Sequence, residues 1–444
     1  MTNDRGAVSL TERTVAAQAT TRSSHKRYII LAILCLMYFI AYLDRVTISV
    51  TAPKIIDEFH FTKTSMGLIF SAFAISYALL QILGGVMGDR YGPRKVLSGL
   101  MGWWSVFTIL TGFATSFVSF FIVRLLFGVG EAGGFPVATR ALATWFPPTM
   151  RGFLQGVAHA ASRSGAAFAP PIVVGLVALT GGWRPPFIIL GTLGVLWSLL
   201  FFALYRDNPA DDPAVNTLEL EKIGMRTAVR TDGVKRRVPW GVILRNRDVW
   251  TLTATYFAYG YTLWIYLTWL PTYLSDARHF TFAQLGIAAS LPLVGGVLGD
   301  LIGGTLSDKI FERTGNLNLA RRSVIIVSFV GAAVFTIPAV FIGSAYASVL
   351  LSAGALFMLE CAVSNCWAVS MDLGGRYYAG TVSGIMNTGF GVAGIISPFI
   401  FGYLADKTGG WTTGFVVGSG ILILGALTML FTDATNLCAE PTDA

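Results

Sequence analysis

The stretch GGVMGDRYGPRK, residues 84–95, decides the fold of this chain. It is a short, glycine-rich segment with one acid and three bases, and it separates two long apolar stretches. Part of it returns as GGTLSDK at residues 303–309, where Gly-Gly-x-x-x-Asp is again followed by a base. Two copies of one polar turn in a largely apolar chain indicate a structure built from two similar halves.

Other features of the chain support this internal repeat. Arg94 corresponds to Arg322 at an offset of 228 residues, and three later features keep that offset. They are GxxxG at residues 152–156 and 380–384, a proline at 170 and 398, and TGGW at 180–183 and 408–411. We therefore predict two parallel repeats related by an axis along the membrane normal. Transporters built in this way bind substrate near the middle of the bilayer, between the halves.

The composition is that of a membrane protein. Of the 444 residues, 54% are hydrophobic and 13% are charged, and the mean hydropathy is +0.64. Soluble domains carry about 25% charged residues, and a membrane-crossing helix needs about 20 mostly apolar residues. These values exclude a soluble enzyme, a disordered chain and a nucleic-acid-binding protein. We predict an all-α membrane protein with twelve transmembrane helices, at residues 28–50, 65–88, 96–114, 117–140, 152–177, 185–205, 248–274, 282–307, 323–342, 345–371, 376–404 and 411–432.

These spans group into two six-helix bundles. We expect a disordered cytoplasmic tail at residues 1–27, an N-terminal bundle at 28–205, a cytoplasmic linker at 206–247, a C-terminal bundle at 248–432 and a second tail at 433–444. The linker carries no catalytic pattern and is too short for a typical output domain of a sensor. We expect a short surface helix within it, at residues 218–225.

The basic excess indicates the orientation in the membrane. The net charge is +8, and of the 32 Lys and Arg residues 24 fall in the expected inner loops and tails, 5 in the outer loops and 3 in the spans. Because cytoplasmic loops of membrane proteins are rich in Lys and Arg, both termini are expected in the cytoplasm. The positive charge therefore requires no nucleic-acid partner. The four cysteines have neither metal-ligand spacing nor the placement of an extracellular disulfide, so no metal site is expected.

Several motifs resemble those of a known transporter family. Residues 84–95 resemble the signature loop of the major facilitator superfamily, and residues 303–309 its degenerate copy. YLDR at 42–45, RLLFGVGEAGGFP at 124–136 and the segment 364–391 resemble the anion:cation symporter family within that superfamily. The resemblance covers residues 28–432 and implies the major facilitator fold. It also implies a proton-coupled carrier of substrates such as galactonate, glucarate, hexuronates or phthalate.

The residues of the signature loop are expected to act as a conformational gate. Asp89 can pair with Arg94 or with a neighbouring helix end, and Gly85 permits a tight inner turn. Arg90 and, in the second copy, Asp308 belong to the same set. Such contacts lock the inner end of a carrier and break when it opens inward. We therefore assign these residues to conformational change and not to substrate binding.

Charged side chains inside the spans mark the candidate site, because each costs about 2.5–3.5 kcal/mol on insertion scales. Arg124 and Glu131 are seven residues apart and share one face of a span, while Asp44 and Arg45 lie together in the first span. Two acids and two bases can form a buried, nearly neutral network. The protonation of its carboxylates then depends on whether an arginine is occupied by a substrate anion. Such a network can couple anion binding to proton loading.

The resemblance implies that Asp44 and Glu131 are the proton-linked carboxylates. We assign Arg45 to the substrate carboxylate, because a planar guanidinium can bind a carboxylate through two hydrogen bonds. Arg124 is assigned to setting the protonation of Glu131, and the roles of the two arginines could be exchanged. Glu360 is a further candidate for proton coupling, with a purely structural role as the alternative.

Polar and aromatic residues complete the expected site. The resemblance implies substrate contacts at Tyr42, Tyr77, Ser364, Trp367 and Asn387. Three tyrosines of the seventh span are expected to line or gate the cavity, namely Tyr256, Tyr259 and Tyr261. The alternative for each aromatic residue is packing in the core or at the membrane interface.

The fifth span departs from the galactonate-type pattern. Those carriers place a glutamine near Ser162, whereas this chain reads HAASRSG at residues 159–165. His159 and Arg163 are four residues apart and share one helix face. By the offset of 228 residues His159 corresponds to Asn387, and we expect both of these residues to face the central cavity. A second binding arginine at position 163 favours an aromatic or a doubly charged acid.

We therefore expect a proton-coupled symporter that imports an organic carboxylate anion by rocker-switch alternating access. The anion is a sugar acid such as galactonate, glucarate or a hexuronate, or an aromatic acid such as phthalate. An anion antiporter or an efflux carrier of the same superfamily is the alternative. The expected partners are the organic anion, protons and the lipid bilayer, with a monomer in a bacterial inner membrane. No enzymatic activity is expected, and no cofactor besides the co-transported proton.

Overall fold

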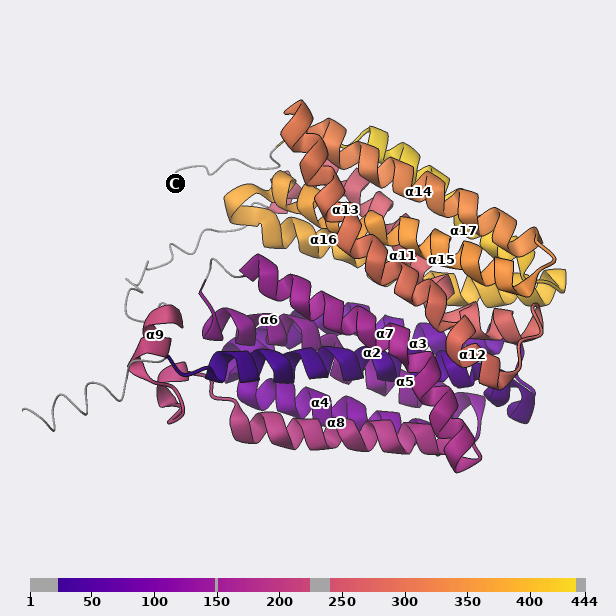
Figure 1. Cartoon of the computed structure of the whole chain (residues 1–444), viewed down its shortest axis with the longest axis horizontal. Coiled ribbons are helices and arrows are strands. Elements are labelled where there is room, and N and C mark those ends of the chain that lie inside the picture. Colours follow the sequence, from indigo (N-terminus) through magenta and orange to yellow (C-terminus); the bar gives the residue numbers. More distant parts are fainter. Residues whose placement is uncertain (1–22, 148–150, 224–239, 437–444) are drawn as a thin grey trace, which may run out of the picture.

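Long helices that run nearly parallel or antiparallel to one axis make up the structure (Figure 1). The computed structural model describes residues 23–147, 151–223 and 240–436, and none of these residues forms a strand. The helices fall into two groups, drawn in indigo to magenta and in orange to yellow (Figure 1). The all-α fold class predicted from the sequence is confirmed.

Each group contains long helices together with shorter ones. The first group comprises α2 (Lys26–Phe59), α3 (Lys63–Tyr91), α4 (Pro93–Thr111), α5 (Phe117–Ala132), α6 (Gly134–Trp145), α7 (Arg151–Thr180) and α8 (Arg184–Leu204). The second comprises α11 (Arg247–Asp276), α12 (Phe282–Ala288), α13 (Ser290–Thr314), α14 (Leu317–Phe341), α15 (Ala345–Cys361), α16 (Val363–Thr408) and α17 (Thr412–Leu430). Between the groups lie η2 (Pro209–Asp211), α9 (Thr217–Ile223) and α10 (Trp240–Ile243).

The helix ends coincide with residues that cap or stop helices. Thr62 accepts the backbone N–H of Ser65 at the start of α3, and Asn246 caps the start of α11 in the same way. At the other ends, Gly315 follows α13 with a φ of 65° and Gly409 follows α16 with a φ of 64°. Glycine adopts this left-handed conformation without strain, so it ends a helix readily.

Ten helical segments of the described part are long and apolar enough to cross a membrane. Two further expected spans correspond to α4 and α11, which are less apolar. Helix α4 begins with Pro93, Arg94 and Lys95, and α11 is rich in Tyr, Trp and Thr. Most of α11 is buried against α16, α17 and α2, so its side chains face protein more than lipid and need not be apolar.

The fourth expected span is divided into α5 and α6 at Gly133. A Cβ atom on Gly84 of α3 would lie 2.3 Å from the Cα of Gly133, and a Cβ on Gly88 would lie 2.7 Å from a methyl carbon of Val137. Only glycine at position 84 allows the two backbones to approach this closely. The signature stretch therefore packs α3 directly against the break between α5 and α6.

The loop predicted between residues 371 and 376 is replaced by continuous helix. Helix α15 ends at Cys361, and α16 then runs through 46 residues. The chain nevertheless folds back inside α16, because the hydroxyl oxygens of Ser370 and Ser383 are 2.7 Å apart. Thirteen residues of a straight helix would extend about 20 Å. Two antiparallel segments are therefore retained, joined by a helical turn instead of a loop.

The two groups repeat each other in detail at the offset found in the sequence. Arg94 Nε donates to the carbonyl of Phe202 near the end of α8 at 2.8 Å, and Arg322 Nε donates to the carbonyl of Thr432 just after α17 at 2.5 Å. Arg94 therefore links the start of α4 to the end of α8, and Arg322 links the start of α14 to the end of α17 in the same way.

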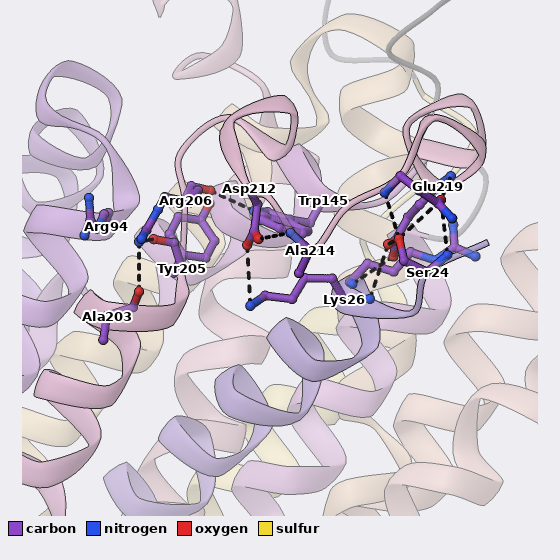
Figure 2. Close-up of polar contacts among 12 residues, drawn as sticks. Ser24, Lys26, Arg94, Trp145, Ala203, Tyr205, Arg206, Asp212, Ala214 and Glu219 are labelled. Carbon is purple, nitrogen blue, oxygen red and sulfur yellow. Dashed lines mark hydrogen bonds and ion pairs between the residues drawn. The ribbon is translucent and has the colours of Figure 1, made fainter. Parts of the chain in front are cut away.

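Glu219 of α9 caps the first helix of the first group (Figure 2). Helix α2 has no acid in its first turn, and the side chain of His25 makes no cap hydrogen bond. The buried Glu219 carboxylate accepts the backbone N–H groups of Lys26 at 3.3 Å and Arg27 at 3.0 Å. Lys26 Nζ also lies 3.5 Å from Asp212 (Figure 2). The segment after α8 thus supplies the anionic cap that the local sequence of α2 lacks. We call this end of the bundle the linker end.

Glu219→Ala is expected to lower the stability of the carrier by about 0.5–2 kcal/mol, the usual cost of losing a helix cap. The thermal unfolding midpoint of the detergent-purified protein measures the effect. Lys222→Ala, at an exposed position of the same short helix, is the matched control and should leave the midpoint unchanged. Equal midpoints for both variants would show that the cap contributes nothing.

At the opposite end, polar contacts join the two groups. The backbone N–H groups of Lys63 and Thr64 at the start of α3 donate to Asp406 near the end of α16, at 3.2 and 2.7 Å. Lys63 Nζ lies 3.7 Å from Asp276 at the end of α11. These contacts hold the groups together on the side of the bundle away from the linker.

Asp406→Ala is expected to open this end in part. Each exposed hydrogen bond contributes about 0.5–1.5 kcal/mol, so loss of the two backbone hydrogen bonds should raise the open population about 5- to 150-fold. Spin labels on cysteines introduced at the exposed positions His60 and Lys407 report the separation of the groups as a distance distribution. Asp57→Asn, an exposed acid at the same end, is the control. An unchanged distribution in Asp406→Ala would show that other contacts hold this end closed.

Candidate substrate-binding site

The charged residues predicted to form a buried network come together between α2 and α5. Arg45 Nη2 forms an ion pair with Glu131 Oε1, and these two side chains are 4% and 1% exposed. Asp44 is buried as well, and among the described residues its carboxylate receives only a long hydrogen bond, 3.4 Å, from the hydroxyl of Thr108 on α4. The ion-pair partner of Glu131 is therefore Arg45, whereas the sequence analysis expected Arg124 to act on Glu131.

Arg124 lies in the same cluster but is not paired. Its side chain forms no hydrogen bond or ion pair with another residue of the described part, and its Nε is buried. Its guanidinium lies over the rings of Phe127 at 4.4 Å and Phe73 at 5.3 Å. It also lines a small cavity between the two groups of helices. A buried guanidinium that makes no direct ion pair with the described residues has N–H donors that could bind an anion.

Four polar atoms of the cluster are buried without a hydrogen-bond partner among the described residues. They are Asp44 Oδ1, Arg45 Nε, Arg124 Nε and Glu131 Oε2. Buried polar atoms of proteins are nearly always hydrogen-bonded, so each of these needs an explanation. An anion can satisfy the arginines and protons can satisfy the carboxylates. The cluster has the chemistry of a site that binds both.

Three aromatic rings surround the guanidinium of Arg45. Its Cζ lies 4.6 Å from the centroid of Tyr42, 4.9 Å from Phe73 and 5.0 Å from Tyr77. Such rings stabilise a buried cation while leaving its N–H groups free to donate. The predicted Tyr42 and Tyr77 thus lie at the arginine. Phe73 was not predicted, although it is four residues before Tyr77 and so shares its helix face.

A second cluster joins the two groups through Arg163 of α7. Arg163 Nη1 lies 2.8 Å from Glu360 Oε1 of α15, and Arg163 Nη2 donates to the hydroxyl of Tyr259 of α11 at 3.0 Å. The Tyr259 hydroxyl in turn donates to Glu360 Oε2 at 2.9 Å. We call these residues the Arg163 triad. It brings together one residue predicted to bind substrate, one predicted to couple protons and one predicted to line the cavity.

Trp367 extends this cluster toward α16. Its Nε1 donates to the hydroxyl of Tyr256 at 3.0 Å, and the ring of Tyr256 stacks on that of Tyr259 with centroids 5.1 Å apart. The tyrosine predicted alongside them, Tyr261, lies instead 6.1 Å from the ring of Phe257. Two of the three tyrosines therefore contact the cluster around Arg163 and Trp367.

The remaining predicted contacts are spread around these clusters. The Ser364 hydroxyl oxygen is buried and has no partner in the described ranges of the chain. Asn387 Nδ2 donates to Gln81 Oε1 of α3 at 3.4 Å and so joins the two groups. The exposed ring of His159 lies 6.3 Å from that of Phe135. Gln81 was missed by the sequence analysis, although an amide four residues after Tyr77 shares its helix face.

Small cavities border the two clusters. One, of about 10 Å³, is lined by Arg45, Arg124 and Trp264 among others, and a second of about 10 Å³ is lined by Arg163 and Glu360. Leu267 of α11 lines both cavities. Each has room for about one water. Side chains must therefore move before an organic anion can occupy this region.

The predicted gate residues make contacts within their own groups. The Arg94 backbone N–H donates to Asp207 at 2.9 Å, and Arg321 Nη1 donates to Asp308 at 3.1 Å. Arg90 is exposed, and a Cβ on Gly85 would lie 3.4 Å from the Cβ of Pro136. The side chain of Asp89 lies outside the described residues, so its predicted pairing with Arg94 stays a prediction.

Comparison with known proteins identifies the family. Residues 34–398 match the Major Facilitator Superfamily. The chain belongs to this superfamily. It is accordingly a multi-pass membrane transporter and not an enzyme, as the motifs predicted.

Several curated relatives of this major facilitator protein are named as carriers of organic anions. It is 46% identical to the probable sulfoacetate transporter SauU of Cupriavidus necator, over 91% of this chain and 93% of the relative. It is 32% identical to the hexuronate transporter of Bacillus subtilis, over 88% and 91% of the two chains. The D-galactonate transporter of Escherichia coli is 28% identical, over 92% and 96%. The predicted relationship to anion:cation symporter carriers is confirmed.

A solved structure shows the same fold. A bacterial homologue of the human lysosomal transporter Spinster, in an inward-facing and occupied conformation, superposes with a TM-score of 0.76 at 19% identity. The match covers 93% of this chain and 97% of that one. At this identity the likeness concerns the fold alone.

Proposed function

We propose that this major facilitator protein is a proton-coupled symporter that brings a small organic anion with two acidic groups into the cytoplasm. Sulfoacetate, which carries a carboxylate and a sulfonate, represents this class. The observation that carries the proposal is a pair of arginine sites, at the buried Arg124 and the half-buried Arg163, on cavities that share the wall residue Leu267. The 46% identity to a probable sulfoacetate transporter supports the same class.

Within the first site, Arg124 is the arginine that receives the substrate anion. Arg45 is engaged with Glu131, whereas Arg124 has no ion pair with a residue of the described part. The exchange of roles that the sequence left open is therefore supported. Arg45 then controls whether Glu131 carries a proton, because Glu131 must be ionised to form its ion pair with Arg45.

Proton coupling is physically required for uptake of such an anion. A membrane potential of 100 mV, negative inside, opposes entry of two negative charges by about 4.6 kcal/mol. Co-transport of two protons removes this opposition, and further protons supply a driving force. Asp44 and Glu131 each have a buried carboxylate oxygen without a partner in the described ranges, and are the proposed acceptors.

The proposed cycle is rocker-switch alternating access by a monomer in a bacterial inner membrane. The linker end and both termini lie in the cytoplasm, as the distribution of Lys and Arg indicates. Substrate and protons enter from the opposite end when the contacts of Asp406 and Lys63 are open. Their closure, together with opening around residues 84–95, exposes the site to the cytoplasm.

Uptake into proteoliposomes tests the proposal. Labelled sulfoacetate is offered under an inward proton gradient, beside galactonate, glucuronate and phthalate, with protein-free liposomes as the control. We expect sulfoacetate to accumulate above its external concentration and a protonophore to abolish the accumulation. Exchange against internal anion that ignores the proton gradient would instead support an antiporter. If galactonate accumulates and sulfoacetate does not, the proposed substrate class is wrong, and the carrier transports a sugar acid with one acidic group.

A further inference from the structure

We infer that the Arg163 triad is a second site of ion exchange, in which the second acidic group of the substrate displaces Glu360 from Arg163 and the displaced Glu360 carboxylate takes up a proton. This inference rests on the proposed function and adds to it a proton acceptor in the second group of helices. It also makes Arg163 the residue that selects substrates with two acidic groups over those with one.

The triad differs from the Arg124 site in its hydrogen bonding. Its three side chains close a ring of contacts, from Arg163 to Glu360, from Glu360 to Tyr259 and from Tyr259 back to Arg163. Both carboxylate oxygens of Glu360 are thereby occupied. In the absence of substrate, Glu360 fills the position of an anion on Arg163.

The surroundings leave no room for a second anion beside Glu360. The adjoining cavity of about 10 Å³ is lined by leucines 263, 267, 293 and 356 as well as by the ion pair. A Cβ atom on Gly296 of α13 would already lie 3.1 Å from the Cγ of Glu360. A substrate group can therefore reach Arg163 only by replacing the Glu360 carboxylate. Arg163 is the accessible member of the triad, with 14% of its side chain exposed against 2% for Glu360.

Charge balance then requires a proton on Glu360. Before exchange, the cation of Arg163 and the anion of Glu360 cancel. After exchange, the substrate group neutralises Arg163 and leaves Glu360 ionised among leucines, where an unpaired charge is strongly disfavoured. A proton from the solvent on the carboxylate restores neutrality. The proton-loaded Glu360 keeps one hydrogen bond as an acceptor from Tyr259.

The groups that act electrostatically on Glu360 come from three elements. They are Arg163 of α7, Tyr259 of α11 and Asp300 of α13. Arg163 is the only cation among them, so its capture by the substrate leaves Glu360 facing Asp300 and a neutral phenol. No cation among these groups then remains to stabilise the ionised carboxylate.

The exchange also links substrate binding to movement of the two groups. Arg163 belongs to the first group and Glu360 to the second, so the ion pair joins them near the middle of the bundle. A substrate with one acidic group can bind at Arg124 and leave this connection intact. A substrate with two breaks the connection and bridges the groups itself.

Proton counting during binding tests the inference directly. The purified carrier in weakly buffered detergent solution is mixed with saturating sulfoacetate, and a pH-indicator dye reports the protons taken up per molecule bound. We expect Glu360→Gln to bind sulfoacetate and to take up one proton fewer than the unmodified protein. Galactonate, which has one acidic group, should give the same proton count for both proteins. Asp57→Asn removes an exposed acid far from the triad and should retain the full count with sulfoacetate.

The outcomes separate this inference from the proposed function. Equal proton counts for sulfoacetate in Glu360→Gln and the unmodified protein overturn the inference and leave the proposed function standing. Failure of sulfoacetate, galactarate and phthalate to bind the unmodified protein overturns both. If Glu360→Gln does not fold, the double variant Arg163→Gln/Glu360→Gln removes both charges together. It should bind sulfoacetate at least about 10-fold more weakly with galactonate unaffected, and an equal loss for both anions overturns the inference.

Discussion

Replacing Arg124 by glutamine is expected to raise the apparent KM for sulfoacetate by about 30-fold or more while leaving the carrier folded. Removing one partner of a buried charge pair costs about 2–5 kcal/mol, and 1.4 kcal/mol corresponds to tenfold in affinity. In the substrate-free protein Arg124 has no ion pair with a residue of the described part. The substitution therefore removes the proposed contact with the substrate and breaks no ion pair within the protein.

Arg45→Gln provides the contrast for this experiment. It leaves the buried Glu131 without its ion-pair partner, which is expected to destabilise the protein by about 3–5 kcal/mol unless Glu131 takes up a proton. Initial rates of uptake at a range of sulfoacetate concentrations give KM, and thermal unfolding in detergent gives stability. A high KM with normal stability in Arg124→Gln supports the assignment. A normal KM in Arg124→Gln together with a high KM in a folded Arg45→Gln would return the substrate contact to Arg45.

The fold was predictable because the physical signals for it are local and repeated. Long apolar stretches predict spans, and the offset of 228 residues predicts two halves that the structure reproduces at Arg94 and Arg322. The loop expected before residue 376 was not predictable in the same way. Gly374, Gly375 and Gly380 lie between Ser370 and Ser383, so the sequence predicts a break in the helix there. The glycines do not decide between an open loop and the helical turn across which the two serine hydroxyls meet.

Which residues cluster at the candidate site was easier to predict than which of them form ion pairs. Charges and amides inside spans are costly, so Arg124, Glu131, Arg163 and Glu360 stand out in the sequence alone. Which of them pair depends on how helices are rotated against each other. Arg124 and Glu131 are seven residues apart on one helix, which corresponds to about 10 Å along the helix axis. Two residues on the same helix face therefore need not be in contact. Arg163 and Glu360 lie in different halves, and no sequence spacing relates them.

Glu131→Gln is expected to lower the accumulation driven by a proton gradient by about 50-fold while preserving exchange of substrate across the membrane. Glutamine has the shape of a protonated glutamate but cannot release a proton. In the unmodified protein, Glu131 either pairs with Arg45, as observed, or carries a proton when substrate is bound. The variant always resembles the protonated state of Glu131, which is the state with substrate bound, so substrate can still bind and cross the membrane.

The size of the loss follows from the energy of one proton. A proton entering down 100 mV contributes about 2.3 kcal/mol, which corresponds to about 50-fold accumulation. We therefore expect the accumulation ratio of Glu131→Gln to fall by about that factor for each coupled proton lost. Counterflow, in which internal unlabelled substrate drives uptake of label without a gradient, should continue at a rate near that of the unmodified protein. Asp44→Asn tests the other proposed acceptor under the same conditions. Full accumulation in Glu131→Gln would remove Glu131 from the coupling mechanism and leave Asp44 and Glu360 as its carriers of protons.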